Sequence, residues 1–406
     1  MKAEVKQLDY YARSCEVCGG SDSEEVLNFT KMMHNNIYSL FEFKMNFVVC
    51  KNCGFAYCNP CPTQESLNRY YSNSLSTFVG QESYSVERRM EIINALYHKG
   101  MNTFLEIGSN ENSAFNKELK SLFEKIVTVE VNASCDSNFS DLESVVGMSE
   151  QADIIAMYYV LEHIPDVNRT LSIASSALLD GGAVIIEVPN IYEYTYDITG
   201  FNYAEHINHF SPHTLTAVAE KHGLELCILS KQKCSRDVGF VAAFTKNGRK
   251  RDYINRTEYL YALDNLISAN RQVQALNINI RKIVDSIHDW KERGLRVVLW
   301  CASFLSEPIV VEYLNTYGQF PCEIVDSDVR KKEYFQCFSN DINVSSPEDA
   351  AYKISQADIF VVCTYSHHHQ IVDNINELRE QSGNSENTLM VYYVDNKYNL
   401  HEYHNS

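Results

Sequence analysis

The 406-residue sequence contains no apolar run that approaches the ~18 residues needed for a membrane-spanning helix. Its first fourteen residues scatter charges such as Lys2, Glu4 and Arg13 among apolar residues, so they lack the basic-then-apolar layout of a secretory signal. Cations are also scarce, since 35 Lys and Arg against 53 Asp and Glu give a formal net charge of −18. This balance works against nucleic acid as the main partner, although backbone N–H groups can still hold a small anion. We therefore expect a cytoplasmic protein without a membrane or nucleic-acid partner.

The composition is that of a soluble globular chain. Hydrophobic residues make up 45% and charged residues 22%, which excludes a disordered or membrane chain. The length favours two or three domains. The 13 cysteines are odd in number and gather near the N-terminus. Without a secretory signal, this pattern favours metal ligation and buried thiols over a disulfide framework.

The N-terminal cysteines form two pairs with the spacing of zinc ligands. Cys15-x-x-Cys18 and Cys50-x-x-Cys53 together supply the four thiolates that fill a tetrahedral Zn²⁺ shell. A full sulfur shell leaves no position for a reacting water, so the predicted zinc is structural. The alternative is a coincidence in a cysteine-rich chain. The nearby thiols that we interpret as packing residues are Cys58 and Cys61.

The order of predicted elements divides the chain into four parts. Residues 1–65 are dense in Cys, Gly and Pro and predict a small zinc-binding β module. In residues 66–247, helical periodicity is followed by short apolar strands, the first of which begins at Thr103. Residues 248–292 predict a long helix with one apolar stripe, and residues 293–406 return to the strand–helix pattern. The predicted fold class is therefore α/β, with two doubly wound Rossmann-like domains after the β module, joined by the long helix.

A glycine turn after the first of these strands lies where a doubly wound sheet binds nucleotides. The segment Leu105-Glu-Ile-Gly-Ser-Asn-Glu-Asn112 follows a strand and opens a helix, and Gly108 lets the backbone come close to a ligand. Glu130 ends the next strand, where it can accept hydrogen bonds from ribose hydroxyls. The turn suits S-adenosylmethionine or a dinucleotide, and the incomplete G-x-G-x-x-G favours the former. An ordinary strand-to-helix turn is the alternative.

Two further segments gather titratable side chains beyond later strands. Val160-Leu-Glu-His-Ile-Pro-Asp166 places His163 just past the carboxyl end of a strand, where it faces the ligand crevice. A purely structural histidine is the alternative. Phe201-Asn-Tyr-Ala-Glu-His-Ile-Asn-His-Phe-Ser211 follows the strand that ends at Pro189 and holds a Tyr, a Glu and two His within residues 203–209. Groups this close can tune one another's pKa for acid–base work.

These motifs resemble those of a known family. Glu-Ile-Gly-Ser-Asn at 106–110, Glu-His-Ile-Pro-Asp at 162–166 and Tyr-Ala-Glu-His at 203–206 are similar to motifs of the three-domain sugar C-methyltransferases of deoxysugar biosynthesis. The paired cysteines in front and Val297-Val-Leu-Trp-Cys-Ala-Ser303 in the tail resemble that family's N-terminal module and C-terminal Rossmann-like domain. The resemblance covers nearly the whole chain. It implies methyl transfer from S-adenosylmethionine to the carbon beside the ketone of a nucleotide-linked keto-deoxysugar.

The resemblance also implies which residues act. Those that would bind S-adenosylmethionine are Glu106, Gly108, Asn110 and Glu130. Those that would line the sugar are His163, Tyr203, Glu205 and His206. A C–H beside a carbonyl is acidic only when the enolate is stabilised, so the site needs a base and a donor for the developing oxyanion. We predict that His206, or Tyr203 as its rival, removes the proton. His163 or Tyr203 then stabilises the oxygen, and Glu205 orients a histidine.

Two positions depart from the family. Its Asn-Asp-Gly in the cofactor turn is Asn110-Glu111-Asn112 here, and the first histidine of its Tyr-His-Glu-His segment is Ala204. Asn tolerates a left-handed backbone better than most residues, so the turn can survive. Two alternatives therefore stay open, an O- or N-methyltransferase on a related small molecule and a catalytically inactive binding protein. Oxygen and nitrogen need less help from a base, so the cluster at 203–206 favours carbon as the nucleophile. Both a monomer and a homodimer fit the sequence.

Overall fold

The computed structural model describes residues 4–36, 39–72, 86–108, 114–132, 137–147, 151–194, 204–230, 239–247, 257–336, 338–364, 366–382 and 389–404. By its internal contacts the chain divides into two compact units. The N-terminal unit contains Lys6–Asn35 and Phe41–Gln272, and the C-terminal unit contains Val273–Ser406 with two short pieces near the N-terminus. The boundary falls inside the helix α6 (Thr257–Glu292), whereas the sequence placed boundaries at 247 and 292.

The N-terminal residues form a β module. Its sheet has the order β1-β4-β5-β11, with β3 paired to β4, and a two-stranded ladder joins β2 to β6. The strands are β1 (Glu4–Gln7), β2 (Tyr10–Tyr11), β3 (Ser23–Asn36), β4 (Ser39–Cys50), β5 (Ala56–Cys58), β6 (Cys61–Pro62) and β11 (Asn208–His209). Strand β11 comes from far along the sequence, because Asn208 pairs with Tyr57 and His209 with Ala56. The segment at 204–209 is thereby attached to the module.

A mixed six-stranded sheet forms the centre of the N-terminal unit. Its order is β12-β13-β10-β9-β7-β8. Neighbours from β10 to β8 are parallel, whereas β13 is antiparallel to both β10 and β12. The strands are β7 (Thr103–Ile107), β8 (Lys125–Val129), β9 (Ala152–Tyr158), β10 (Leu178–Pro189), β12 (Leu224–Ser230) and β13 (Gly239–Lys246). The sequence predicted short apolar strands of the parallel kind, the first of them beginning at Thr103, but not the antiparallel pair.

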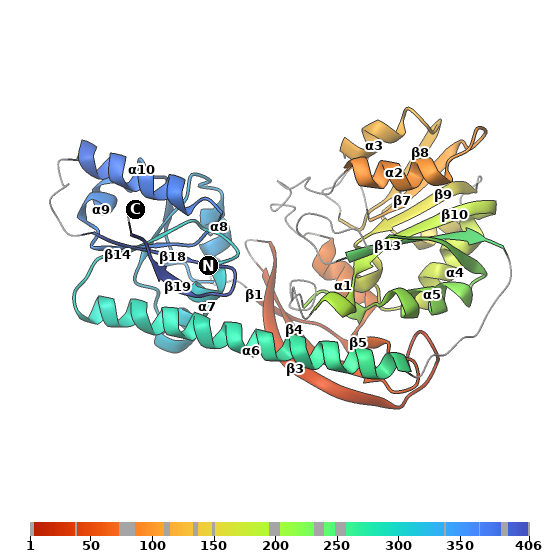
Figure 1. The fold of residues 1–406 in the computed structure, drawn as a ribbon, viewed down its shortest axis with the longest axis horizontal. Helices are drawn as coiled ribbons and strands as arrows, with labels where there is room; N and C mark the ends of the chain where they lie inside the picture. Colours follow the sequence, from red (N-terminus) through yellow and green to blue (C-terminus); the bar gives the residue numbers. More distant parts are fainter. Residues whose placement is uncertain are drawn as a thin grey trace. The chain divides into compact units, whose positions relative to one another are not determined.

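Helices cover both faces of this sheet because its strands are apolar on both sides. Phe104 packs with α2 (Val86–Leu96) and α3 (Ala114–Leu119), while its neighbour Leu105 packs with α4 (Val167–Ala177) and α5 (Pro212–Glu220). Successive strand residues point to opposite faces, so one apolar strand supplies two cores. Figure 1 shows these helix pairs on opposite sides of the sheet. The remaining short elements are α1 (Gln64–Tyr71), η2 (Glu143–Gly147), η3 (Leu161–His163) and η4 (Ile191–Glu193).

The C-terminal unit has its own six-stranded sheet with the order β16-β15-β14-β17-β18-β19. All pairs are parallel except β18 with β19. The strands are β14 (Val297–Trp300), β15 (Glu323–Val325), β16 (Val344–Ser345), β17 (Ile359–Val362), β18 (Met390–Val394) and β19 (Leu400–Glu402). The helices are α7 (Ser306–Tyr317), α8 (Lys331–Gln336), α9 (Ala351–Gln356) and α10 (His368–Gln381). The strand order reverses beside β14, as in a Rossmann-like sheet.

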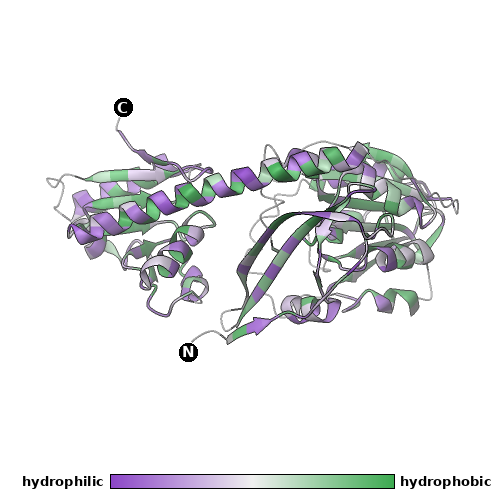
Figure 2. Cartoon of the chain, turned by 90° about the horizontal axis from the view of Figure 1, so that it is seen from below, coloured by the Kyte–Doolittle hydropathy of each residue, from purple (hydrophilic) through white to green (hydrophobic). Residues whose placement is uncertain are grey.

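The long helix predicted within 248–292 is α6, which begins at Thr257. Figure 2 shows hydrophilic and hydrophobic residues alternating along it. Its apolar stripe is buried at Leu266, Ile280, Ile283 and Ile287. A spacing of three or four residues puts such side chains on one face of a helix. Within the described ranges, no helix combines the length and apolar character that crossing a membrane requires.

Candidate functional site

The four predicted metal ligands lie together. The Sγ atoms of Cys15, Cys18, Cys50 and Cys53 are all within 4.8 Å of one another. Cys15 Sγ lies 3.4 Å from Cys53 Sγ, and Cys18 Sγ lies 3.5 Å from Cys50 Sγ. Zinc–sulfur bonds of about 2.3 Å place tetrahedral sulfurs about 3.8 Å apart, so the cluster fits zinc with small adjustments.

Turns in the backbone bring each cysteine pair together. Gly19 N–H donates to Cys15 O at 2.7 Å, and Gly54 N–H donates to Cys50 O at 2.9 Å. Cys58 and Cys61 are fully buried and lie outside the four-thiol cluster. Burial raises the pKa of the Cys58 thiol to about 11. That group therefore stays protonated at neutral pH, as a packing residue would.

The predicted cofactor turn follows β7 and touches the end of β9. Gly108 has φ +83°, a left-handed conformation that favours glycine. A Cβ atom at this position would lie 2.3 Å from Cγ2 of Val160. The Gly108 N–H donates to Val129 O at 2.8 Å, which ties the turn to the end of β8. Asn110, the next predicted ligand, lies outside the described residues.

The carboxylate of Glu106 belongs to a buried charged group. Arg89 of α2 places its Nη1 4.0 Å from Glu106 Oε1 and its Nε 3.7 Å from Oε2 of Glu187, which belongs to β10. The Arg89 guanidinium also stacks 3.8 Å above the ring of Tyr158. The cofactor motif of the sequence contains Glu106, but nothing in the sequence indicates Arg89, because a single arginine in an amphipathic helix gives no sign of its partner.

Glu130 occupies the strand end expected of a ribose ligand. It follows β8, and the N–H of Asn132 donates to its Oε1 at 2.9 Å. Burial raises the pKa of the Glu130 carboxyl above its ordinary value. Its backbone N–H donates to Phe139 O at 2.9 Å, which fixes the turn that carries it.

His163 ends the short helix η3 beyond β9. Its Nδ1 lies 3.0 Å from Glu205 O and 3.2 Å from the hydroxyl of Tyr71. Burial lowers the pKa of His163, so its imidazole is neutral at neutral pH. The ring of His206 lies 4.9 Å from the ring of His163. The structure therefore brings together two histidines that are 43 positions apart, while Tyr203 lies outside the described residues.

Two tyrosines of α1 complete this group, and no motif of the sequence indicates them. The hydroxyl of Tyr70 donates to the carboxylate of Glu205. Tyr71 is held beside His163, and burial raises the pKa of its hydroxyl well above the ordinary value. The only local signal was a pair of tyrosines in an amphipathic segment, which is usually a packing feature. We call the group of Tyr70, Tyr71, His163, Glu205 and His206 the rim site.

Arg13 fixes the two segments that carry the rim histidines. Its buried guanidinium donates to Pro165 O at 2.7 Å and to Ile207 O at 2.9 Å. It also donates to Asn208 Oδ1 at 2.8 Å, and Asn208 Nδ2 donates to Ile164 O at 2.8 Å. Hydrogen bonds from a charged group in a buried setting are strong, so this network positions the rim site.

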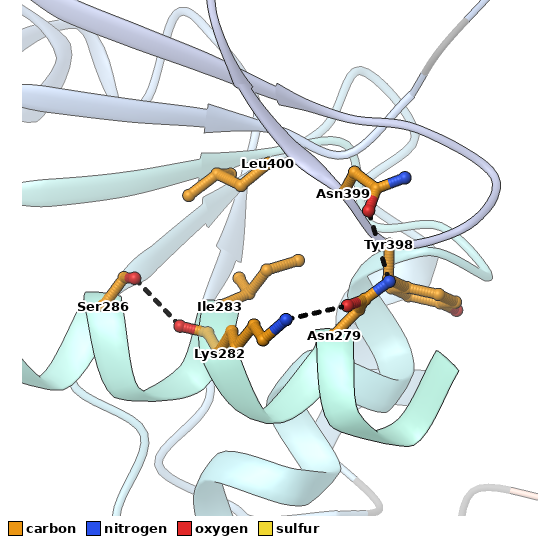
Figure 3. A pocket seen from close by; sticks show the side chains of 7 residues that line it. All are labelled: Asn279, Lys282, Ile283, Ser286, Tyr398, Asn399 and Leu400. Atoms are coloured by element: carbon orange, nitrogen blue, oxygen red, sulfur yellow. Dashed lines mark hydrogen bonds between the residues drawn. The ribbon is translucent and has the colours of Figure 1, made fainter. Parts of the chain in front are cut away.

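A pocket in the C-terminal unit lies between α6 and the residues before β19 (Figure 3). Asn279 Nδ2 donates to Asn399 Oδ1 at 3.2 Å, and Lys282 Nζ lies 3.5 Å from Asn279 Oδ1. Its polar groups are thus bonded to one another, and the described lining has no acid–base pair. The full lining is Asn279, Lys282, Ile283, Ser286, Tyr398, Asn399 and Leu400.

Comparison with known proteins identifies a domain in the central part of the chain. Residues 81–229, which include Gly108 and the rim histidines, match a family model described as a methyltransferase domain. The predicted enzyme class, a methyltransferase, is confirmed over these residues by this match. Among curated proteins, none matches the sequence.

Several solved structures are similar to part of the chain. One is a methyltransferase dependent on S-adenosylmethionine from Archaeoglobus fulgidus, with 17% identity, 42% of this chain and 100% of that chain covered, and a TM-score of 0.36. Another is the 1,6-didemethyltoxoflavin-N1-methyltransferase of Burkholderia thailandensis, with 12% identity, 48% and 96% coverage, and a TM-score of 0.35. At such low scores these likenesses carry no weight in assigning a substrate.

Proposed function

We propose that this methyltransferase acts on a carbon atom, namely the carbon beside the ketone of a nucleotide-linked keto-deoxysugar, with a structural zinc ion in its four-cysteine cluster. The observation that carries the proposal is the rim site, where a neutral His163, His206 and the Tyr70–Glu205 pair converge. Carbon acids need both a base and an oxyanion donor, and the rim site supplies groups for both roles.

S-Adenosylmethionine would bind at the turn after β7 and supply an electrophilic methyl group. Gly108 allows close approach of the backbone, and Glu130 can accept hydrogen bonds from the ribose. The contact between Gly108 and Val160 supports a donor position beside the rim, because Val160 O accepts the N–H of His163 at 3.0 Å. Holding the two reactants close is a large part of the catalytic effect in such reactions.

The proton and electron changes are simple. A base, His206 or its rival Tyr203, takes the proton from the carbon next to the ketone, and the C–H electrons move into an enolate. His163 or Tyr203 steadies the enolate oxygen, and Glu205 orients a histidine. The enolate carbon then forms a bond to the methyl carbon. The methyl–sulfur bond breaks with its electrons on sulfur, and the neutral thioether leaves.

Hydrogen exchange distinguishes carbon methylation from the alternatives. The protein is incubated in D₂O with S-adenosylhomocysteine and a panel of nucleotide-linked keto-sugars, and mass spectrometry measures deuterium uptake at the carbon beside the ketone. An enolate mechanism predicts uptake without transfer, whereas O- or N-methylation predicts none. His206→Gln should lose the exchange, and His98→Gln, at an exposed position of the same unit, is the matched control. Methyl transfer to oxygen or nitrogen without exchange would reject the proposal.

A further inference from the structure

We propose that Glu162, His163 and His206 bind a divalent metal ion at the rim site, in addition to the four-cysteine cluster. One ligand atom from each residue lies within 4.8 Å of the others. Metal–ligand bonds of about 2.0–2.2 Å place neighbouring ligand atoms about 3–4 Å apart. The separation of 3.7 Å between Glu162 Oε1 and His163 Nε2 falls in this range. Small side-chain rotations would bring the third ligand into the same shell.

The hydrogen bond on the far side of His163 prepares its ring for a metal. Nδ1 lies 3.0 Å from Glu205 O, and a carbonyl oxygen can only accept, so a hydrogen bond between these atoms requires the proton on Nδ1. Nε2 then presents its lone pair on the side of the Glu162 carboxylate. At 3.7 Å the two electron-rich atoms are too far apart for a hydrogen bond. A cation between the Glu162 carboxylate and the Nε2 lone pair of His163 would attract both groups. Histidine ligands of metals typically donate their other ring N–H to a carbonyl or a carboxylate.

Burial of the carboxylate supports the same conclusion. The side chain of Glu162 is 0% exposed, whereas that of His163 is 21% exposed. A carboxylate removed from water is stabilised by a nearby dication, because the desolvation cost is offset by direct coordination. The histidine side of the site faces the more accessible region. An ion there would keep coordination positions for a substrate oxygen, as catalytic metal sites do.

The ligand set indicates the kind of metal. Two imidazoles and one carboxylate suit Zn²⁺, Co²⁺, Fe²⁺ or Mn²⁺, whereas Ca²⁺ and Mg²⁺ prefer oxygen ligands. The scaffold for this set is local and rigid, since Ile207 N–H donates to Glu162 O at 2.9 Å and Arg13 bonds to the same segment. The three ligands therefore come from two segments that are already fixed to each other.

The role of this ion rests on the proposed function. A divalent ion beside the donor turn would polarise the ketone oxygen of the substrate and stabilise the enolate as a Lewis acid. His163 and His206 would then act as ligands, and proton removal would fall to Tyr203, the rival base. The ion and a catalytic base at His206 are thus exclusive alternatives, since a coordinated imidazole has no lone pair for a proton.

Cobalt titration tests the site without donor or sugar. Full-length protein with Zn²⁺ in the four-cysteine cluster is titrated with Co²⁺, and visible absorption is recorded. We expect weak d–d bands without thiolate charge transfer. Glu162→Gln and His206→Gln should each weaken Co²⁺ binding by more than about tenfold, because each removes a ligand. His98→Gln should leave binding unchanged. Circular dichroism checks that each variant is folded, and either variant is sufficient if the other unfolds.

The outcomes separate this inference from the proposed function. Absence of d–d bands at millimolar Co²⁺, or unchanged binding in folded Glu162→Gln and His206→Gln, would overturn the metal site. Methyl transfer to a keto-sugar carbon in the same preparation would still support the proposed function. If both variants lose cobalt binding, the metal site is supported. If the wild-type protein then methylates no keto-sugar, the proposed function is rejected while the metal site stands.

Discussion

Replacement of Gly108 by alanine probes the geometry on which the donor site depends. The wild-type residue has φ +83°, and an added Cβ would lie 2.3 Å from Val160 Cγ2. Val160 is β-branched, so its side chain has few rotamers into which it can retreat. The substitution therefore introduces both backbone strain and a steric clash, whether or not a donor is bound.

The two effects can be given magnitudes. A residue with a Cβ in the left-handed region is less stable by about 1–2 kcal/mol. Overpacking of a filled site costs about 1–3 kcal/mol more. We expect the free energy of unfolding of the N-terminal unit to fall by about 2–5 kcal/mol in Gly108→Ala. In the double variant with Val160→Ala the clash disappears but the backbone strain stays, so a favourable coupling of about 1–3 kcal/mol is expected.

Calorimetry measures the effect, and the tryptophans provide an internal control. Both tryptophans of the chain, Trp290 and Trp300, belong to the C-terminal unit. Heat absorption reports unfolding of the whole chain, whereas tryptophan fluorescence reports that unit. Gly108→Ala should lower the calorimetric transition of the N-terminal unit and leave the fluorescence transition in place. A loss below about 0.5 kcal/mol, the range of an ordinary surface substitution, would refute the geometry of this turn.

Three further predictions concern the metal, the scaffold and the cofactor. Cys50→Ser should remove the bound zinc and unfold the β module, because the ion loses one of its four ligands. Elemental analysis checks this, with about one zinc ion per chain expected in the wild type. Full zinc content in the variant would exclude Cys50 as a ligand. Arg13→Lys keeps the charge but not the planar guanidinium that bonds to Pro165, Ile207 and Asn208. We expect the free energy of unfolding to fall by about 2–4 kcal/mol, with a lower kcat at unchanged zinc content. A variant with wild-type kcat and denaturation midpoint would contradict this role. Burial raises the pKa of the Glu130 carboxyl above the ordinary ~4.3 of glutamate. As the pH falls through this raised pKa, the carboxylate becomes protonated, and we expect the affinity for S-adenosylmethionine to fall. Calorimetric titration over pH 5–8 should show this fall in the wild type but not in Glu130→Gln, and parallel curves would rule out a role for Glu130 in binding.

The helices and strands with strong local patterns were predictable. The strand predicted to begin at Thr103 is β7 (Thr103–Ile107), whose five residues are all buried. The antiparallel strand β12 was missed because it alternates between half-buried and exposed residues, without the continuous apolar run of the parallel strands. Its partner β13 is as buried as a central strand, but its direction depends on pairing with β10, which no local pattern encodes.

The sequence by itself determined the chemistry that this chain can carry. Cysteine spacing indicated the thiol cluster, and a glycine turn after a buried strand indicated the donor turn, since both depend on residues close along the chain. The sequence also indicated His163, Glu205 and His206, but only the tertiary structure decided how the residues of the rim site meet and what supports them. It placed Tyr70 against Glu205, His163 beside His206, and Arg13 across both segments, at separations of up to about 200 positions. Such contacts depend on how sheets and helices pack, and a local sequence pattern carries no information on which distant residue will be the partner.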